Sequence, residues 1–279
     1  MNKEQGISNR EVLPFNIHDS LFLVRYSTPI FAPMLKGKKI VVVMPAYNAA
    51  KTLEQTYADI PFGIVDEVIL VDDASTDRTL DVAAALNIKH IISHDNNKGY
   101  GANQKTCYTK ALDLNADIII MLHPDYQYNP RLIPSMASLI AEDVYPVVIG
   151  SRILGKGAIE NGMPVYKYFF NRCLTFFQNV LLNQKLSEYH TGYRAYSAAV
   201  LRDINFMANS DDFVFDNQVL LQIIYKKYAI GEISCPAKYF AEASSINFSR
   251  SCRYGAGIVK NTFGFVMQKM RMTQLKMYS

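Results

Sequence analysis

The sequence has 279 residues, of which 49% are hydrophobic and 19% are charged. This composition excludes a disordered polymer, a collagen-like repeat and a small disulfide scaffold, and the length suits one large α/β core. The net charge of +4 is modest, and we expect no nucleic-acid partner.

The sequence lacks the usual signals of secretion or membrane insertion. Its four cysteines lie far apart and form no CxxC pair, which favours free thiols in a reducing compartment. The stretch MNKEQGISNREV is too polar for a signal peptide, and no uncharged apolar run approaches the ~18 residues of a membrane span. We therefore expect a cytoplasmic globular protein.

After an N-terminal extension over residues 1–37, strands and helices are predicted to alternate. We expect strands over residues 39–48, 66–75, 90–94, 116–125 and 144–152, with helices over 51–59, 76–86 and 104–114. A helix over 165–182, a loop over 187–197, a helix over 213–225 and a strand over 230–240 follow. This order predicts an α/β fold with a mainly parallel sheet flanked by helices. We expect one domain over residues 38–242 and a tail over 243–279.

Polar motifs follow four of the predicted strands: PAYN, DDAS, NKGYG and HPDYQ. In an open parallel sheet, ligands bind beyond the carboxyl ends of the strands. The motifs are therefore expected to converge on one binding site.

The acidic pair in DDAS has two interpretations. Asp72 and Asp73 can accept hydrogen bonds from a base or a ribose, or the motif can cap the next helix through Ser75. The glycine motif is weaker: Gly99 lets the backbone approach a ligand and Lys98 adds charge, but plain loop structure explains both. Neither motif matches a dinucleotide fingerprint or a phosphate loop.

The HPDYQ motif indicates a metal site. His123, Asp125 and Gln127 alternate along an extended segment, where an imidazole, a carboxylate and an amide oxygen can share a divalent ion. Mg²⁺ or Mn²⁺ suits the two oxygen ligands. An ion bound by few protein ligands also needs substrate phosphates to complete its shell. The alternative is an ordinary turn, because Pro124 lies within the motif and Asn129 and Pro130 follow it.

Later motifs supply cations and a second carboxylate. Arginine is suited to planar phosphate recognition, and the candidates in this half are Arg152, Lys167, Asn171 and Arg194, although surface salt bridges would also explain the charged ones. Asp216 lies among apolar residues at a helix start. It is a candidate general base, or a carboxylate favoured there by the helix dipole.

The tail is basic. No acidic residue follows Glu242, and Val259, Phe263, Val266 and Met270 recur at helical spacing. Such a helix can lie on an anionic membrane surface or dock on its own core, and both interpretations stay open.

The ordered set PAYN, VDDAST, NKGYGAN, HPDYQ, GSR, TGYR and FDxQ resembles family 2 inverting glycosyltransferases with the GT-A fold, over about residues 39–254. The branch it resembles most is that of the dolichol- or polyprenyl-phosphate sugar transferases. The resemblance implies a nucleotide-sugar donor, with UDP or GDP as nucleotide, and Mg²⁺ or Mn²⁺ as cofactor. It also implies one-step displacement at the anomeric carbon. The acceptor would be a polyprenyl phosphate or a cell-envelope glycan precursor.

The resemblance also implies roles for individual residues. It places the nucleotide sugar against Pro45, Ala46, Tyr47, Asn48, Asp72, Asp73, Lys98, Gly99 and His123. The metal would lie on Asp125 and Gln127, and the acceptor phosphate and donor diphosphate would lie near Arg152, Lys167, Asn171 and Arg194. Asp216 falls where the family has its base.

This chain departs from the family at several of these positions. His123 stands where the family usually has an acid, Ala49 replaces another acid, and Lys167 and Asn171 stand where Arg and Ser are common. A degenerate transferase that binds nucleotide sugar without turnover therefore stays open. A nucleotidyltransferase is disfavoured because PAYNAAKT is no Gly-rich basic loop, and a membrane-surface scaffold would leave the polar motifs unexplained. The sugar and the oligomeric state are undetermined, and a homo-oligomer stays open.

Overall fold

The computed structural model describes residues 35–237, 239 and 248–279. These residues belong to one compact unit, Ala32–Ser279. Its centre is a seven-stranded sheet with the order β3-β2-β1-β4-β6-β5-β7. The strands are β1 (Ile40–Ala46), β2 (Glu67–Asp72), β3 (His90–Ser93), β4 (Ile118–Met121), β5 (Val147–Ser151), β6 (Arg194–Ser197) and β7 (Ile230–Ser234).

The sheet is mainly parallel, as predicted. Strands β3, β2, β1 and β4 run parallel to one another, and β5 pairs with β7 in parallel. Only β6 is antiparallel, and it lies between β4 and β5. All seven residues of β1 are buried, because the β-branched run IVVVMPA lies at the centre with helices on both faces.

The prediction of a loop over residues 187–197 is wrong for its last four residues, which form β6. Its sequence RAYS is short and begins and ends with polar residues, so it lacks the apolar pattern of a buried strand. The strand is nevertheless central, and Arg194 within it is fully buried.

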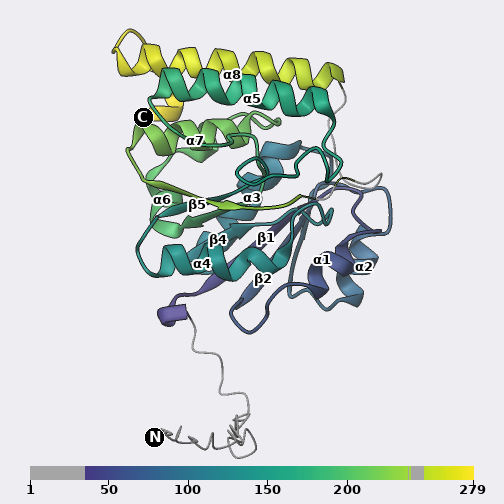
Figure 1. Ribbon diagram of the computed structural model, residues 1–279. Coiled ribbons are helices and arrows are strands. Elements are labelled where there is room, and N and C mark those ends of the chain that lie inside the picture. The colour runs from purple at the N-terminus through teal and green to yellow at the C-terminus, as the bar shows by residue number, and fades with distance from the viewer. Residues whose placement is uncertain (1–34, 238, 240–247) are drawn as a thin grey trace, which may run out of the picture. The chain divides into compact units, whose positions relative to one another are not determined.

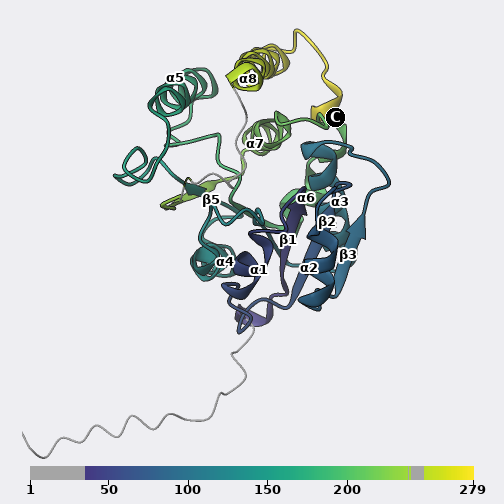
Figure 2. The same cartoon turned by 90° about the vertical axis from the view of Figure 1, so that its right-hand side faces the viewer.

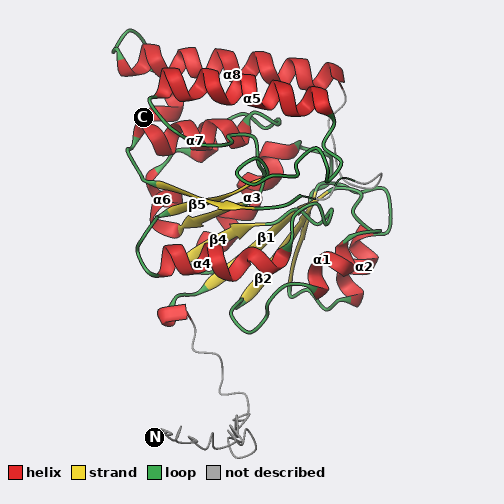
Figure 3. Ribbon diagram, in the orientation of Figure 1, coloured by secondary structure: helices red, strands yellow, loops and turns green. Residues whose placement is uncertain are grey.

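Helices cover both faces of the sheet (Figures 1 and 3). On one face, Val42 and Met44 of β1 share a core with α1 (Leu53–Ala58), α2 (Thr79–Ala85) and α4 (Ile133–Ala141). On the other, Val41 and Val43 share a core with α3 (Tyr100–Asp113), α6 (Ala198–Asp203) and α7 (Phe215–Tyr225). Short 3₁₀ helices span Leu35–Gly37, Pro130–Leu132, Phe206–Ala208 and Lys276–Tyr278. The alternation of β1 side chains between two cores is the period of a buried strand.

A pair of helices lies outside α7. Helices α5 (Val165–Leu182) and α8 (Phe248–Lys269) pack side by side, and α8 also contacts α7 (Figure 2). Ile258, Thr262 and Phe265 are the buried face of α8, so this helix of the basic tail docks on the core. Among the described residues, no helix is long and apolar enough to cross a membrane.

Candidate active site

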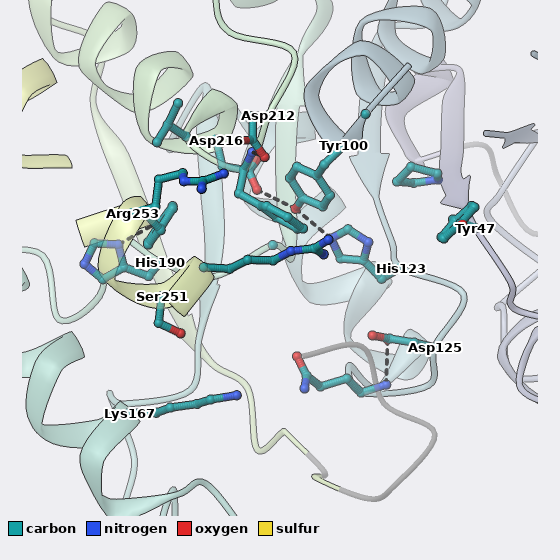
Figure 4. A pocket seen from close by; sticks show the side chains of 18 of the residues that line it. Tyr47, Tyr100, His123, Asp125, Lys167, His190, Asp212, Asp216, Ser251 and Arg253 are labelled. Carbon is teal, nitrogen blue, oxygen red and sulfur yellow. Dashed lines mark hydrogen bonds between the residues drawn. The ribbon is translucent and has the colours of Figure 1, made fainter. Parts of the chain in front are cut away.

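A cavity of about 1220 Å³ lies beyond the carboxyl ends of β1, β2 and β4. Figure 4 shows Tyr47, His123 and Asp125 on one side of it and Lys167 and Arg253 on the other. The first side consists of loops that follow strands, which we call the donor half. The second consists of α5, the start of α8 and the segment around His190, which we call the acceptor half. Asp216, at the start of α7, lies between the two halves.

Most of the predicted site residues line this one cavity. They are Pro45, Ala46, Tyr47, Asn48, Asp73, Gly99, His123, Asp125, Gln127, Arg152, Lys167, Asn171 and Asp216. Three predicted residues do not line it: Asp72, Lys98 and Arg194. The carboxyl edge of the sheet therefore brings together segments that lie far apart in the sequence.

The loops of the donor half turn sharply. Asn48, Ala74 and Tyr126, one after each of β1, β2 and β4, have φ values of 53°, 58° and 55°. The left-handed region is unfavourable for Ala and Tyr, and such residues often occur at functional sites. Tyr126 donates a hydrogen bond to Asp59 at 2.6 Å, and the residues on either side of Tyr126 line the cavity.

Asp73 organises the glycine loop. One carboxylate oxygen accepts a hydrogen bond from the Lys98 backbone N–H and the other from that of Gly99, both at 2.9 Å. His94 Nδ1 lies 2.7 Å from the first oxygen. The two carboxylate oxygens therefore fix the loop that begins α3, and Asp73 is also one of the residues that line the cavity.

Asp72 and Lys98 serve the fold in ways that the sequence did not indicate. The Asp72 side chain is fully buried and accepts a hydrogen bond from the Ser75 N–H at 3.0 Å, which fixes the turn after β2. The interpretation that Ser75 caps the next helix is wrong, because α2 begins at Thr79 after Arg78 and has no side-chain cap. Lys98 contributes its backbone N–H to Asp73, and its exposed side chain lies outside the cavity lining.

Asp125 and Gln127 are the candidate metal ligands. Both line the cavity and are 8% and 7% exposed, and the Gln127 N–H donates to Asp125 Oδ1 at 3.1 Å. The described residues contain no group of three or more His, Cys, Asp or Glu suited to a metal. One carboxylate and one amide oxygen fit an ion of the Mg²⁺ type, which binds one or two protein ligands, water and substrate phosphates.

A hydrogen-bonded chain joins the donor half to Asp216. The Tyr100 hydroxyl donates to Asp216 Oδ2 at 2.6 Å and lies 3.0 Å from His123 Nε2. Burial and the Asp216 carboxylate raise the pKa of Tyr100 well above its ordinary value, so it stays a phenol. Dashed lines in Figure 4 mark both contacts.

Two of the predicted phosphate ligands are bound to an acidic residue of the protein. Arg152 forms an ion pair with the fully buried Glu188 and also donates to the His190 carbonyl at 2.8 Å. Asn171 Nδ2 donates to the same Glu188 carboxylate at 2.8 Å. Burial lowers the pKa of Arg152, but Glu188 outweighs this effect and raises it well above the ordinary value. The charge of Arg152 is therefore largely compensated inside the wall.

The expectation that Arg194 faces a phosphate does not fit its position. Its buried guanidinium donates to the backbone carbonyls of Thr191 at 2.8 Å and Tyr189 at 3.0 Å, and to that of Asp216. Arg194 thus links the segment before β6 to the first turn of α7. Because it donates to the backbone carbonyl of Asp216, it fixes the backbone at that residue and leaves the carboxylate to other contacts.

Several lining residues were missed as site residues by the sequence analysis. In the acceptor half they include His190, Tyr239, Arg250, Ser251, Arg253 and Tyr254, and Tyr100 and Asp212 lie between the halves. Arg250 and Arg253 belong to the tail, of which the sequence analysis considers only the overall positive charge and the apolar spacing. Their spacing of three residues at the start of a helix was the available signal, because it puts both on one face.

Comparisons with known proteins identify the family and the fold. Residues 41–204 match the family described as Glycosyl transferase family 2. Over 221 residues the chain is 28% identical to the UDP-N-acetylglucosamine--dolichyl-phosphate N-acetylglucosaminyltransferase of Methanococcus voltae, which covers 74% of this chain and 88% of that protein. It is also 29% identical over 140 residues to a dolichol-phosphate mannosyltransferase of Pyrococcus furiosus, covering 48% of this chain and 38% of that protein.

A solved structure with the same fold is glucosyl-3-phosphoglycerate synthase from Mycobacterium tuberculosis, in complex with Mn²⁺, UDP and glucosyl-3-phosphoglycerate. It has a TM-score of 0.63 at 16% identity and covers 86% of both chains. Because the family match extends over more than half of the sequence, the chain belongs to glycosyl transferase family 2 and has the GT-A fold.

Proposed function

We propose that this glycosyltransferase moves a hexose from a nucleotide-diphosphate sugar to a polyprenyl phosphate, with inversion at the anomeric carbon. The observation that carries the proposal is the composition of a single cavity. Strand-end loops with a candidate metal pair form one half, a wall that is both cationic and apolar forms the other, and Asp216 lies between them.

The donor half suits a nucleotide and its diphosphate. Tyr47 is 51% exposed at the cavity wall, where its ring is available for stacking on a base. Asp125 and Gln127 would hold Mg²⁺ or Mn²⁺. When bound, that ion neutralises charge that develops on the leaving diphosphate.

The acceptor half suits an anion attached to a hydrocarbon chain. Lys167, Arg250 and Arg253 bring cations to the cavity wall. Phe170 and Leu174 of α5, together with Val259 of α8, line the same wall with apolar side chains. A lipid phosphate presents these two chemistries together, whereas a sugar hydroxyl presents neither. The names of the two relatives, which act on dolichyl phosphate, support the same acceptor class.

Asp216 is the proposed general base. The phosphate oxygen of the acceptor attacks the anomeric carbon, the bond from that carbon to the diphosphate oxygen breaks, and the diphosphate leaves with the electron pair. A proton still on the acceptor phosphate passes to Asp216. Because the second ionisation of a phosphate monoester has a pKa near ~6, we expect the gain from the base at neutral pH to lie at the low end of the usual ~10²- to 10⁴-fold.

The outer face of the helix pair suits a membrane surface. Phe169, Phe176 and Val180 of α5 are 62%, 71% and 62% exposed. Phe263 of α8 is 51% exposed, and Met270, which follows α8 directly, is 64% exposed. Exposed basic residues on the same helices and just after them are Arg172, Lys260, Lys269 and Arg271. Apolar side chains beside positive charges fit the interface of an anionic bilayer. We therefore propose peripheral binding at the inner face of the membrane, where α5 and α8 would bring the cavity close to its lipid.

A transfer assay tests the proposed function. The protein is incubated with radiolabelled UDP- and GDP-hexoses, detergent-dispersed polyprenyl phosphate and Mg²⁺ or Mn²⁺. We expect label in the organic phase with one donor, and loss of that label with EDTA. A thermal-shift panel of UDP, GDP, CDP and dTDP accompanies it. A diphosphate-specific shift without transfer would contradict the proposal and identify the chain as a degenerate nucleotide-sugar binder.

A further inference from the structure

We propose that Tyr100 is a positioning residue for Asp216, and that it reserves one oxygen of that carboxylate for the proton of the acceptor. The inference rests on the proposed function, in which Asp216 is the base. It assigns a role to a residue that contacts neither the sugar nor the metal in that proposal.

The first observation is that the two carboxylate oxygens of Asp216 have different surroundings. Asp216 is 6% exposed, and its Oδ2 accepts the Tyr100 hydrogen bond at 2.6 Å. Its Oδ1 is buried and has no hydrogen-bond partner among the described residues. A buried carboxylate oxygen without a donor is costly, and such an exception calls for a functional reason. Acceptance of a proton at Oδ1 is that reason here.

The second observation concerns the direction of the hydrogen bonds. Tyr100 has a single hydroxyl proton, and Asp216 as a base has none to give. Tyr100 therefore donates to Asp216, and His123 Nε2 must carry the hydrogen that points to the Tyr100 oxygen at 3.0 Å. In this chain of hydrogen bonds each donor points toward Asp216: His123 donates to Tyr100, and Tyr100 donates to Asp216 Oδ2. Protonation of Asp216 at Oδ1 leaves both hydrogen bonds in place.

The third observation is that the surrounding packing fits the Tyr100 and His123 rings closely. The Tyr100 ring stacks on Phe213 with a centroid distance of 5.0 Å and on His123 with one of 5.5 Å. A Cβ atom at Gly192 would lie 2.5 Å from His123 Nε2 and 3.5 Å from the Tyr100 hydroxyl. Only glycine leaves room for this arrangement. His123, which stands where the family usually has an acid, is thus packed against Tyr100, the residue that donates to Asp216.

A double-mutant cycle tests the proposal with the transfer assay described above. The variants are Tyr100→Phe, Asp216→Asn and the combination of both. Tyr100→Phe keeps the ring stack and removes only the hydroxyl, and we expect kcat to fall about 10-fold because one hydrogen bond to a charged group is lost. We expect the KM for the donor and the thermal shift with its diphosphate to stay the same. The double variant should be no slower than Asp216→Asn alone, since Tyr100 acts only through that carboxylate.

Tyr108→Phe is the matched control. Tyr108 belongs to the same helix, α3, is fully buried, and its hydroxyl donates to the Gln104 side chain at 2.9 Å. Its loss should leave kcat unchanged, and circular dichroism and the Tm establish that each variant folds. A Tyr100→Phe enzyme within two-fold of wild type, or losses that multiply in the double variant, would overturn the inference while the proposed function stands. If the wild type transfers no sugar to any acceptor, the proposed function fails and the inference fails with it.

Discussion

The two halves of the cavity use their polar side chains in opposite ways. In the donor half, Asp125 and Gln127 follow a buried strand and line the cavity at the edge of the sheet. In the acceptor half, Arg152 and Asn171 line the cavity too, but both are bound to the buried Glu188. The comparison teaches that a cation at a cavity wall is a ligand candidate only after its partners within the protein have been counted. By that criterion we propose Lys167 and Arg253 of the cavity wall, rather than Arg152, as cations for the acceptor phosphate.

The largest expected effect concerns stability and distinguishes the two kinds of arginine. Arg152→Ala would leave the Glu188 carboxylate buried without its cation, and we expect the free energy of unfolding to fall by about 3–5 kcal/mol. Arg253→Ala, the matched change on an exposed side chain of the same wall, should alter it by no more than about 0.5 kcal/mol. Urea denaturation measures both. If both variants have the same free energy of unfolding, the ion pair of Arg152 with Glu188 does not contribute to stability as proposed.

The next effect concerns the metal pair of the donor half. Asp125→Ala removes the only carboxylate of that pair, and we expect turnover to fall on the order of 100-fold because stabilisation of the leaving diphosphate is weakened. The Mn²⁺-dependent part of the thermal shift with the matching diphosphate should disappear as well. Asp95→Ala, on an exposed aspartate outside the cavity lining, is the control. A variant that keeps both turnover and the metal-dependent shift would remove Asp125 from the metal site.

The acceptor half is tested by a smaller effect with a different kinetic signature. The double variant Arg250→Ala/Arg253→Ala should raise the KM for polyprenyl phosphate about 10-fold or more, as expected when charge-assisted hydrogen bonds to phosphate are lost. The KM for the donor should not change. Arg131→Ala, an exposed arginine outside the cavity lining, serves as control. If the KM for the donor rises instead, these arginines contact the donor diphosphate, and their assignment to the acceptor half is wrong.

The smallest expected effect is on membrane binding. Phe169→Ser/Phe176→Ser should weaken binding to vesicles that contain anionic lipid about 5-fold, since an interfacial helix buries only part of each ring. Phe62→Ser, which changes a 49% exposed phenylalanine outside α5 and α8, should have no effect. Co-sedimentation at low and high salt measures the binding. Equal binding of wild type and the α5 variant would contradict the proposed orientation.

The donor half could largely be predicted from the sequence because its residues follow strands. A buried strand such as β1 fixes where the chain leaves the sheet, and residues just beyond it must lie at the carboxyl edge. The left-handed turns at Ala74 and Tyr126 could not be predicted from the sequence, because neither residue type favours that conformation.

The acceptor half could be predicted only in part, because its roles depend on tertiary partners. Nothing near Arg152 in the sequence indicates that Glu188 will compensate its charge. Nor does the pattern RAYS indicate a central antiparallel strand that buries Arg194. The buried face of the tail helix also differs in part from the apolar positions that the helical spacing indicated. Ile258, Thr262 and Phe265 face the core, whereas Phe263 and Met270, two of the four spaced residues, are exposed.

The measurement that tests the central claim most directly is the stoichiometry of the reaction. Nucleoside diphosphate released and lipid-linked sugar formed are counted in the same tube, with and without polyprenyl phosphate. If the two halves form one site, the ratio is one to one and both products depend on the lipid phosphate. Diphosphate release that is independent of the lipid, with no lipid-linked sugar, would contradict the account.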